Sequence, residues 1–271
     1  MNILHSEIQK IKANYRTYCG LIVLWGLGIL IGINVWYNPS LLPLKQIGFR
    51  ISGLYVPGLT LYPLAVVGPV VAVLIAGESI AGERIKGTLR MILTRPISRS
   101  RIYLGKLSLI ILYSLFMVFS TLLLTSLLGF FLFGGGTVVL PVELNDMTSG
   151  FFTLSAPEAL LRLIFAGLTL SFYILTYASI ALCLSSFLTN SLASPIFTLI
   201  FTAASTVIQN LEVFKPISSY LITRHLLSWQ NLLNQSIEWD KLFFSLIIVG
   251  SYFLGSLLIG ITVFNRIDEK A

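Results

Sequence analysis

Six stretches of about 20 mostly apolar residues dominate the sequence, and each is long enough to cross a membrane as a helix. They cover residues 18–36, 58–76, 107–133, 159–182, 192–208 and 242–264. Charged residues make up only 11% of the chain, whereas a soluble domain carries about 25%. We therefore expect an all-α membrane protein with six transmembrane helices, forming a single domain over residues 1–271.

The leader, residues 1–17, has the pattern of an amphipathic helix. Ile3, Leu4, Ile8 and Ile11 share one helical side, and polar residues occupy the opposite side. This pattern predicts an N-terminal interfacial helix lying on the membrane, with a simple polar leader as the open alternative. A cleavable signal peptide is disfavoured, because the first apolar run ends without a small-residue cleavage site.

The basic residues are distributed unevenly along the chain, which predicts its orientation. Twelve of the 18 Lys and Arg residues fall in 1–17, 78–106 and 265–271, whereas 134–158 contains none. Because Lys and Arg are retained on the cytoplasmic side, we expect both termini inside a plasma (inner) membrane. The net charge of +7 then follows the inner membrane face with its anionic lipid, so the sequence gives no reason to expect nucleic acid as a partner.

Two longer segments are expected to be outer loops. Residues 134–158 begin with a glycine run and are interpreted as a flexible loop, and residues 209–241 form the second. Within the second loop, four residues repeat at helical spacing and predict a helix along the outer interface: Ile222, His225, Leu226 and Trp229.

The inner segment 78–106 combines helical periodicity with a proline stop. Apolar residues recur at helical spacing at Ala81, Ile85, Leu89 and Ile92. Charged residues occupy the opposite side of the same predicted helix, at Glu83, Lys86 and Arg90. Pro96 ends this helix, and Ser98 or Ser100 is placed to cap the next one. The segment is predicted to leave the membrane as a short amphipathic helix, turn, and re-enter.

This segment also resembles a known family. Its pattern E-x3-G-T-L-x4-T-R-P-I-S-R-x2-I-x2-G-K, from Glu83 to Lys106, is similar to the loop between the second and third spans of the type-2 family of ABC transporter permeases. The topology and the terminal Phe264-x-Arg266-x-Asp268 agree with the resemblance. In size the chain is similar to the stand-alone permeases that serve nitrous-oxide reductase maturation.

The resemblance implies a non-catalytic permease subunit of an ATP-driven exporter. In this family the loop forms a coupling helix that docks on a cytoplasmic ABC ATPase, present in two copies that carry the ATP and Mg. The residues implied in ATPase coupling are Glu83, Lys86, Gly87, Thr88, Leu89, Arg90, Arg95, Pro96, Ser98 and Arg99. Gly87 is expected to permit close backbone approach, and Glu83 to pair with Lys86, Arg90 or a basic residue of the partner.

Two further assignments leave alternatives open. Family members pair through the first and fifth spans, so small residues there are candidates for a seam with a second permease copy: Gly28, Gly32, Ser194, Ala203 and Ala204. Packing within one subunit is the alternative. Polar residues of the fourth span either line a substrate pathway or hydrogen-bond to neighbouring helices: Thr169, Ser171, Tyr173, Thr176, Tyr177 and Ser179.

Other residues offer no catalytic or metal chemistry. The sequence lacks a G-x4-G-K-[ST] phosphate loop, so we expect no cofactor in this chain. His5 and His225 are interpreted as surface histidines and Cys19 and Cys183 as small packing residues, and Arg162 is expected to extend to the interface. A non-transporting membrane scaffold or sensor, which recruits a cytoplasmic partner through the basic loop, is the alternative function.

Overall fold

Long helices make up most of the computed structural model, which describes residues 15–38, 52–93, 98–143 and 146–266. Five helices are long and apolar enough to cross a membrane: α2 (Tyr15–Tyr37), α4 (Tyr55–Ile85), α6 (Arg99–Phe133), α7 (Ala156–Phe187) and α10 (Trp239–Arg266). The expectation of an all-α membrane protein is confirmed. The predicted interfacial helix, residues 1–17, lies outside the described residues except for the first turn of α2.

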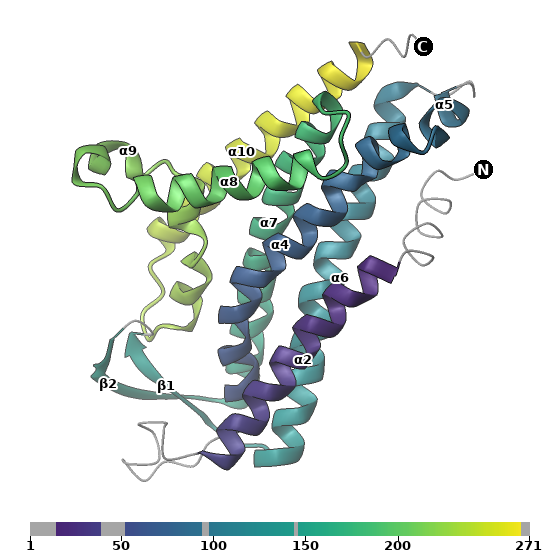
Figure 1. The fold of residues 1–271 in the computed structure, drawn as a ribbon. Helices are drawn as coiled ribbons and strands as arrows, with labels where there is room; N and C mark the ends of the chain where they lie inside the picture. Colours follow the sequence, from purple (N-terminus) through teal and green to yellow (C-terminus); the bar gives the residue numbers. More distant parts are fainter. Residues whose placement is uncertain (1–14, 39–51, 94–97, 144–145, 267–271) are drawn as a thin grey trace.

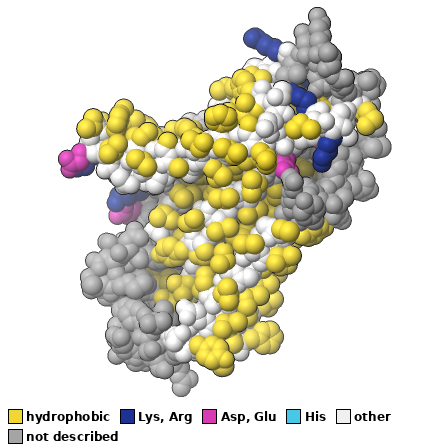
Figure 2. Space-filling model, viewed as in Figure 1, with side chains coloured by type: hydrophobic (Ala, Val, Ile, Leu, Met, Phe, Trp, Pro, Cys, Tyr) yellow, Lys and Arg dark blue, Asp and Glu magenta, His cyan; other side chains and the backbone are white. Residues whose placement is uncertain are grey.

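The remaining elements are short. They are α5 (Thr88–Leu93), α8 (Ala193–Ile208), α9 (Lys215–Ser218), the strands β1 (Val138–Glu143) and β2 (Asp146–Leu154), and the 3-10 helices η2 (Glu212–Phe214), η3 (Ile222–His225) and η4 (Ser228–Leu233). Hydrophobic side chains cover much of the flank of the helices (Figure 2), as expected for a surface that faces lipid tails.

The central helix is α4, which packs against α2, α6, α7 and α8. Figure 1 shows α2, α4, α6 and α7 running along the length of the molecule. Small residues allow the neighbours of α4 to come close: a Cβ on Gly68 would lie 2.7 Å from Ile174 of α7, and one on Gly77 would lie 2.5 Å from Pro195 of α8. The core therefore lies where α4 meets α6 and α7.

The fifth predicted span, residues 192–208, corresponds to α8, which is not a straight helix of full membrane length. This helix has only 16 residues, a length of about 24 Å, and the hydrocarbon core of a bilayer is about 30 Å thick. After Ile208 the chain bends by 96° into the segment Glu212–Ser218, and it counts as a sixth span only if the bent pair is taken together. In Figure 1, α8 runs across α4 instead of along it. Polar Gln209 and Asn210 end the apolar run too early for a straight crossing.

The first outer loop, residues 134–158, contains a β-hairpin that the sequence analysis does not predict. Strands β1 and β2 pair antiparallel, with Val138 opposite Leu154 and Glu143 opposite Asp146. Val138 and Leu154 are buried against the molecule. The glycine run ends α6, since Gly134 adopts a φ of 74°, but the apolar and β-branched residues that follow it favour a strand over a flexible loop. The hairpin lies at the end of the molecule opposite α5 (Figure 1).

The second outer segment, residues 209–241, packs into the molecule, and the prediction of one helix along the outer interface is wrong. Ile222 and His225 belong to η3, Trp229 belongs to η4, and Leu226 lies in the turn between these two 3-10 helices, both of which contact α10. Trp229 is fully buried, and its ring meets Tyr62 of α4 edge-on with 5.0 Å between the centroids. His225 is also buried, at 6% exposure, so it is not the surface histidine that we expected.

Candidate functional site

The second long helix continues beyond the apolar run that predicts a span over residues 58–76, and it ends in a glycine turn. α4 extends to Ile85, and Gly87 follows with a φ of 69° before α5 begins at Thr88. The Gly87 N–H donates to the Arg84 carbonyl at 3.1 Å, and the Thr88 hydroxyl donates to the Glu83 carbonyl at 3.2 Å. A left-handed residue after a helix C-terminus favours glycine. The predicted amphipathic helix through Ile92 is therefore interrupted at Gly87.

This interruption changes which residues face outward. Ala81 and Leu89 are fully buried, whereas Ile85 is 62% exposed although it shares their helical spacing. Met91 of α5 is 65% exposed and Lys86 is exposed as well. We call Ile85, Lys86 and Met91 the α4–α5 tip. Leu89, expected at an ATPase contact, instead anchors α5 in the core.

The structure shows why residue 87 is glycine even without a partner. A Cβ built at this position meets nothing within 4 Å, so no part of the described chain approaches it closely. The position requires glycine because of its backbone conformation, which L-residues with a Cβ rarely adopt.

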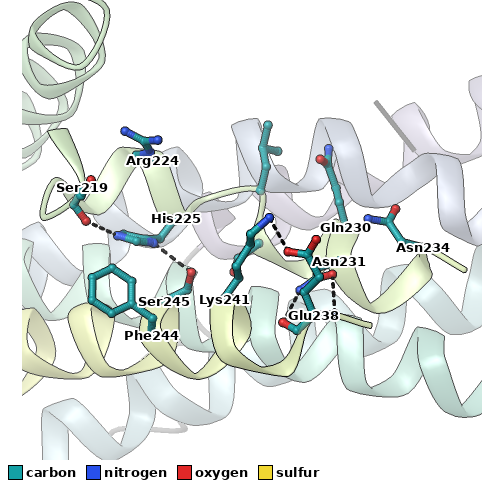
Figure 3. A pocket seen from close by; sticks show the side chains of 12 residues that line it. Ser219, Arg224, His225, Gln230, Asn231, Asn234, Glu238, Lys241, Phe244 and Ser245 are labelled. Atoms are coloured by element: carbon teal, nitrogen blue, oxygen red, sulfur yellow. Dashed lines mark hydrogen bonds and ion pairs between the residues drawn. The ribbon is translucent and has the colours of Figure 1, made fainter. Parts of the chain in front are cut away.

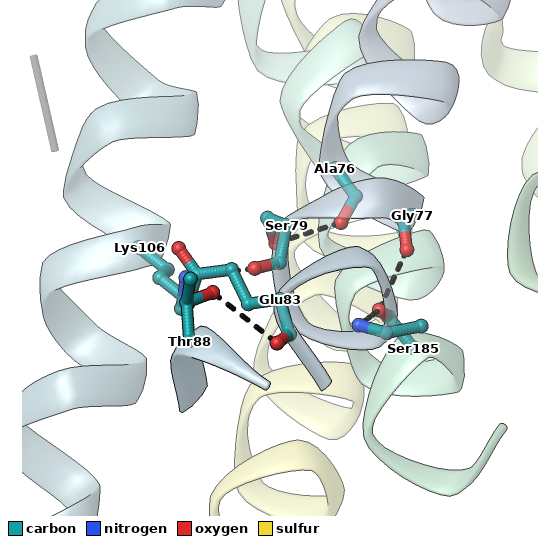
Figure 4. Close-up of polar contacts among 8 residues, drawn as sticks. Ala76, Gly77, Ser79, Glu83, Thr88, Lys106 and Ser185 are labelled. Atoms are coloured by element: carbon teal, nitrogen blue, oxygen red, sulfur yellow. Dashed lines mark hydrogen bonds and ion pairs between the residues drawn. The ribbon is translucent and has the colours of Figure 1, made fainter. Parts of the chain in front are cut away.

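Glu83 forms an ion pair that joins α4 to α6 (Figure 4). The Lys106 Nζ lies 2.7 Å from the Glu83 Oε2, and it also donates to the Ser79 carbonyl at 2.7 Å. The side chain of Lys106 is 1% exposed and that of Glu83 is 14% exposed. Lys106 is thus a partner of Glu83 inside the chain, which the sequence does not predict. The carboxylate orients α4 against α6 inside the subunit.

A second set of contacts joins α4 to the end of α7. The Ser185 hydroxyl donates to the Gly77 carbonyl at 2.6 Å and accepts from the Ala81 N–H at 2.9 Å, so it bridges two backbone groups that pair in an ordinary helical turn (Figure 4). The Arg84 guanidinium donates to the carbonyls of Ser186 and Leu188 at 3.4 and 3.5 Å. A cation at a helix C-terminus satisfies carbonyls that lack a helical partner.

Arg99 connects the start of α6 to the end of α10, because its guanidinium donates to the Asn265 carbonyl at 3.1 Å. Ser98 occupies the N-cap position of α6, where its carbonyl accepts from the Arg101 N–H but its side chain makes no capping bond. Thr94, Arg95, Pro96 and Ile97 lie outside the described residues, as does the side chain of Arg90. The contacts near the α4–α5 tip thus join α4 to α6 and α7, and Arg99 joins α6 to α10.

Three of the five candidate seam residues pack inside the subunit. A Cβ on Gly28 would lie 2.6 Å from Thr125 of α6, and one on Gly32 would collide with Leu128 of the same helix. Ser194 is fully buried and donates to the Ala181 carbonyl of α7. Of the two roles left open for these three residues, the contacts favour packing within one subunit, where small residues bring helices together. Ala203 and Ala204 are exposed on α8.

The polar groups of α7 also find partners within the chain. Arg162 donates to the Asn234 carbonyl at 2.7 Å and pairs with Glu158 at 2.8 Å. Tyr173 hydrogen-bonds to Ser228, and Ser179 to Ser256, each at 2.7 Å. Of the two roles left open for this helix, these bonds favour contacts between neighbouring elements.

Sequence reasoning misses Lys106, Arg84 and Ser185 as structural residues. Lys106 directly precedes an apolar run, a place where a lysine usually marks the membrane boundary. Its partner Glu83 is 23 residues away in the sequence, and local residue spacing cannot predict a contact between positions so far apart. Ser185 carries no signal beyond its place near the end of an apolar segment.

Together, the long apolar helices and the polar contacts at the α5 end define a multi-pass helical membrane protein. Residues 2–269 match the family described as ABC-2 family transporter protein, and the chain belongs to this family. It is thus a permease subunit of an ABC transporter. No curated protein matches the chain. The similarity to the permeases of nitrous-oxide reductase maturation stays a prediction.

Proposed function

We propose that this permease exports its substrate as a dimer driven by two cytoplasmic ATPase subunits, and that each ATPase docks on an α4–α5 tip. The ATPases bind ATP and Mg, while this chain performs no chemistry itself. Both termini lie in the cytoplasm, since the basic residues gather at the α5 end. Export, the dimer and the inner membrane rest on the resemblance to type-2 permeases.

The observation that carries the proposal is the composition of the tip. Ile85 and Met91 are large apolar side chains that are 62% and 65% exposed beside the charged Lys86. Exposed apolar residues next to a charge are typical of a protein contact. Lipid tails are an unsuitable neighbour for Lys86, because a charge in the hydrocarbon core is costly.

The surrounding contacts explain how docking can move the permease. A displacement of α4 at its α5 end acts on α6 through Glu83–Lys106 and on α7 through Arg84. Close-packed elements shift as units instead of deforming continuously. A closing motion of two ATPases therefore becomes a rigid movement of the helices.

Negative charges introduced at the tip test the docking. The tagged chain is isolated from its native membranes, and the ATP hydrolysis that copurifies with it is measured per mole of chain. Met91→Glu and Lys86→Glu are expected to lower that hydrolysis about tenfold or more, the effect of losing a contact worth about 1.4 kcal/mol. Their melting temperatures should equal the wild-type value, because both side chains are exposed.

The matched control is Lys215→Glu, a charge reversal at an exposed lysine of α9 outside the tip. It should leave the copurifying hydrolysis unchanged. Full retention of hydrolysis in both tip variants contradicts the docking assignment.

Reconstitution distinguishes transport from the alternative function, which is a scaffold or sensor without transport. Inside-out vesicles that contain the purified complex are incubated with ATP and a solute extract of the source cells, and their contents are read by mass spectrometry. ATP-dependent accumulation of a solute supports export. ATP-dependent loss of a trapped solute favours import, and hydrolysis without any solute movement favours the scaffold.

A further inference from the structure

A polar cavity of about 630 Å³ lies between the η3–η4 segment and the first turns of α10 (Figure 3). Pockets that bind small molecules have volumes of about 300–1,000 Å³. Because the last turn of α10 contacts Arg99 near α5, the first turns of α10 place this cavity toward the opposite end of that helix. It is therefore separate from the α4–α5 tip.

Two of its walls are held by bonds within the protein. The Asn231 amide donates to the Glu238 carbonyl at 2.7 Å and accepts from the Glu238 N–H at 3.1 Å. His225 lies between the Ser219 carbonyl, 3.0 Å from its Nε2, and the Ser245 hydroxyl, 2.9 Å from its Nδ1. Since a carbonyl only accepts, Nε2 carries the proton. Burial lowers the pKa of His225, so the ring is neutral and Ser245 donates to Nδ1.

Gln230 differs from these residues, because its side chain is buried and lines the cavity without a bond inside the protein. It is 5% exposed, and no described residue makes a hydrogen bond to its side-chain amide. Its amide faces the cavity. Its two donors and one acceptor are therefore available to a molecule in the cavity.

The charged groups of the cavity favour an anion. Arg224 and Lys241 line it, against the single carboxylate of Glu238. Lys241 and Glu238 form an exposed ion pair, which is weak in water. The Nη1 of Arg224 donates to the Ser218 hydroxyl at 2.7 Å, and the guanidinium has further N–H groups in the same plane. Arg224, Lys241 and Gln230 offer donors from three positions, which suit a tetrahedral oxyanion better than a planar carboxylate.

Apolar side chains at the same cavity indicate where such an anion comes from. Leu227 and Phe244 line it and are each 44% exposed. Trp239, at the first residue of α10, is 54% exposed and packs on Phe243. Exposed tryptophan at a helix end is typical of the level of lipid headgroups. The cavity therefore combines cations with an apolar rim at the depth of a phosphate layer.

We propose that this cavity binds the phosphate of a phospholipid headgroup, held by Arg224, Lys241 and Gln230, with the acyl chains lying along Leu227 and Phe244. The site is independent of ATPase docking. It gives the permease a fixed lipid in the leaflet opposite α5, between α10 and the segment that follows α8.

Lipid-dependent stabilisation of the purified full chain tests the site. The melting temperature is measured in dodecyl maltoside with added phosphatidylglycerol, with diacylglycerol of the same chains, or with inorganic phosphate, and bound lipid is counted by native mass spectrometry. Phosphatidylglycerol should raise the melting temperature, whereas diacylglycerol should not. Gln230→Leu, Arg224→Gln and Lys241→Gln should each weaken lipid binding about tenfold.

Gln230→Leu separates binding from folding. It replaces an amide that has no partner among the described residues with an apolar group of similar size, so the lipid-free protein should melt at the wild-type temperature or above. Lys215→Gln, outside the cavity, should keep full lipid binding.

Three results overturn the proposal. They are unchanged lipid binding in all three cavity variants, an equal effect of diacylglycerol, and an equal effect of inorganic phosphate, which would assign the cavity to a soluble anion.

Discussion

Lys106 is a lysine whose ammonium lies in the interior, at 1% exposure, with Glu83 and the Ser79 carbonyl as neighbours. Removing one member of a buried ion pair leaves the other charge uncompensated, which typically costs about 3–5 kcal/mol. Lys106→Met is therefore expected to lower the free energy of unfolding by about 3 kcal/mol, since Glu83 keeps some contact with water. Thermal unfolding of the purified chain in detergent measures this loss.

Two further variants make the result specific. Lys86→Met, at an exposed position three residues after Glu83, should leave the unfolding temperature unchanged. The double variant Glu83→Gln with Lys106→Met should recover much of the lost stability, because neither charge remains. If Lys106→Met is no less stable than Lys86→Met, the ion pair does not orient α4 and α6.

At the scale of elements, two glycines bring the start of α4 and the end of α6 into backbone contact. A Cβ on Gly53 would lie 2.6 Å from the carbonyl carbon of Gly129, and one on Gly129 would collide with the carbonyl oxygen of Gly53. The Gly53 N–H also donates to the Gly134 carbonyl at 3.1 Å. Because the neighbour is backbone, no side chain can rotate away to make room.

Gly129→Ala is therefore expected to separate the two elements and to destabilise the protein by about 2–3 kcal/mol, as overpacking does. The control is Gly26→Ala in α2, where a Cβ meets nothing within 4 Å. That change should be neutral or slightly stabilising, since alanine favours a helix. Equal melting temperatures for the two variants would contradict the close approach of α4 and α6.

The elements also show what the sequence can predict. Apolar runs identify α2, α4, α6, α7 and α10 because a span needs only length and hydropathy. Hydropathy does not report that α4 continues for nine residues past its apolar run, since polar residues also form helices. Nor does hydropathy report that the chain bends by 96° after α8.

The candidate site was predictable only in part, for a similar reason. Gly87 and Pro96 mark the turn in the sequence, so its location is readable. The partners of Glu83, Arg84 and Arg99 come from α6, α7 and α10, and those pairings depend on packing between distant segments. A single sequence shows the charges but not the helices that bring them together.

For the whole molecule, α6 is the one long helix that the structure describes between the α4–α5 tip and the hairpin, so these two places should lie on opposite sides of the membrane. Single cysteines at Lys86 and Thr137, both exposed, test this in a chain with Cys19→Ser and Cys183→Ser. A membrane-impermeant maleimide should label Lys86→Cys in inside-out vesicles and Thr137→Cys in right-side-out vesicles.

The cysteine-free chain supplies the background labelling. The reverse pattern would place both termini outside, and labelling of both cysteines from one side would show that α6 does not cross the membrane.

Ser185 limits the relative motions that α4 and α7 can make. Its hydroxyl bonds to both Gly77 and Ala81, so α4 cannot slide along α7 by one residue, about 1.5 Å, without losing both bonds. Rotation about an axis through Ser185 leaves them intact. The two helices can therefore rotate relative to each other about a point near their α5 end. A small change in the angle between them then produces a large displacement at their far ends.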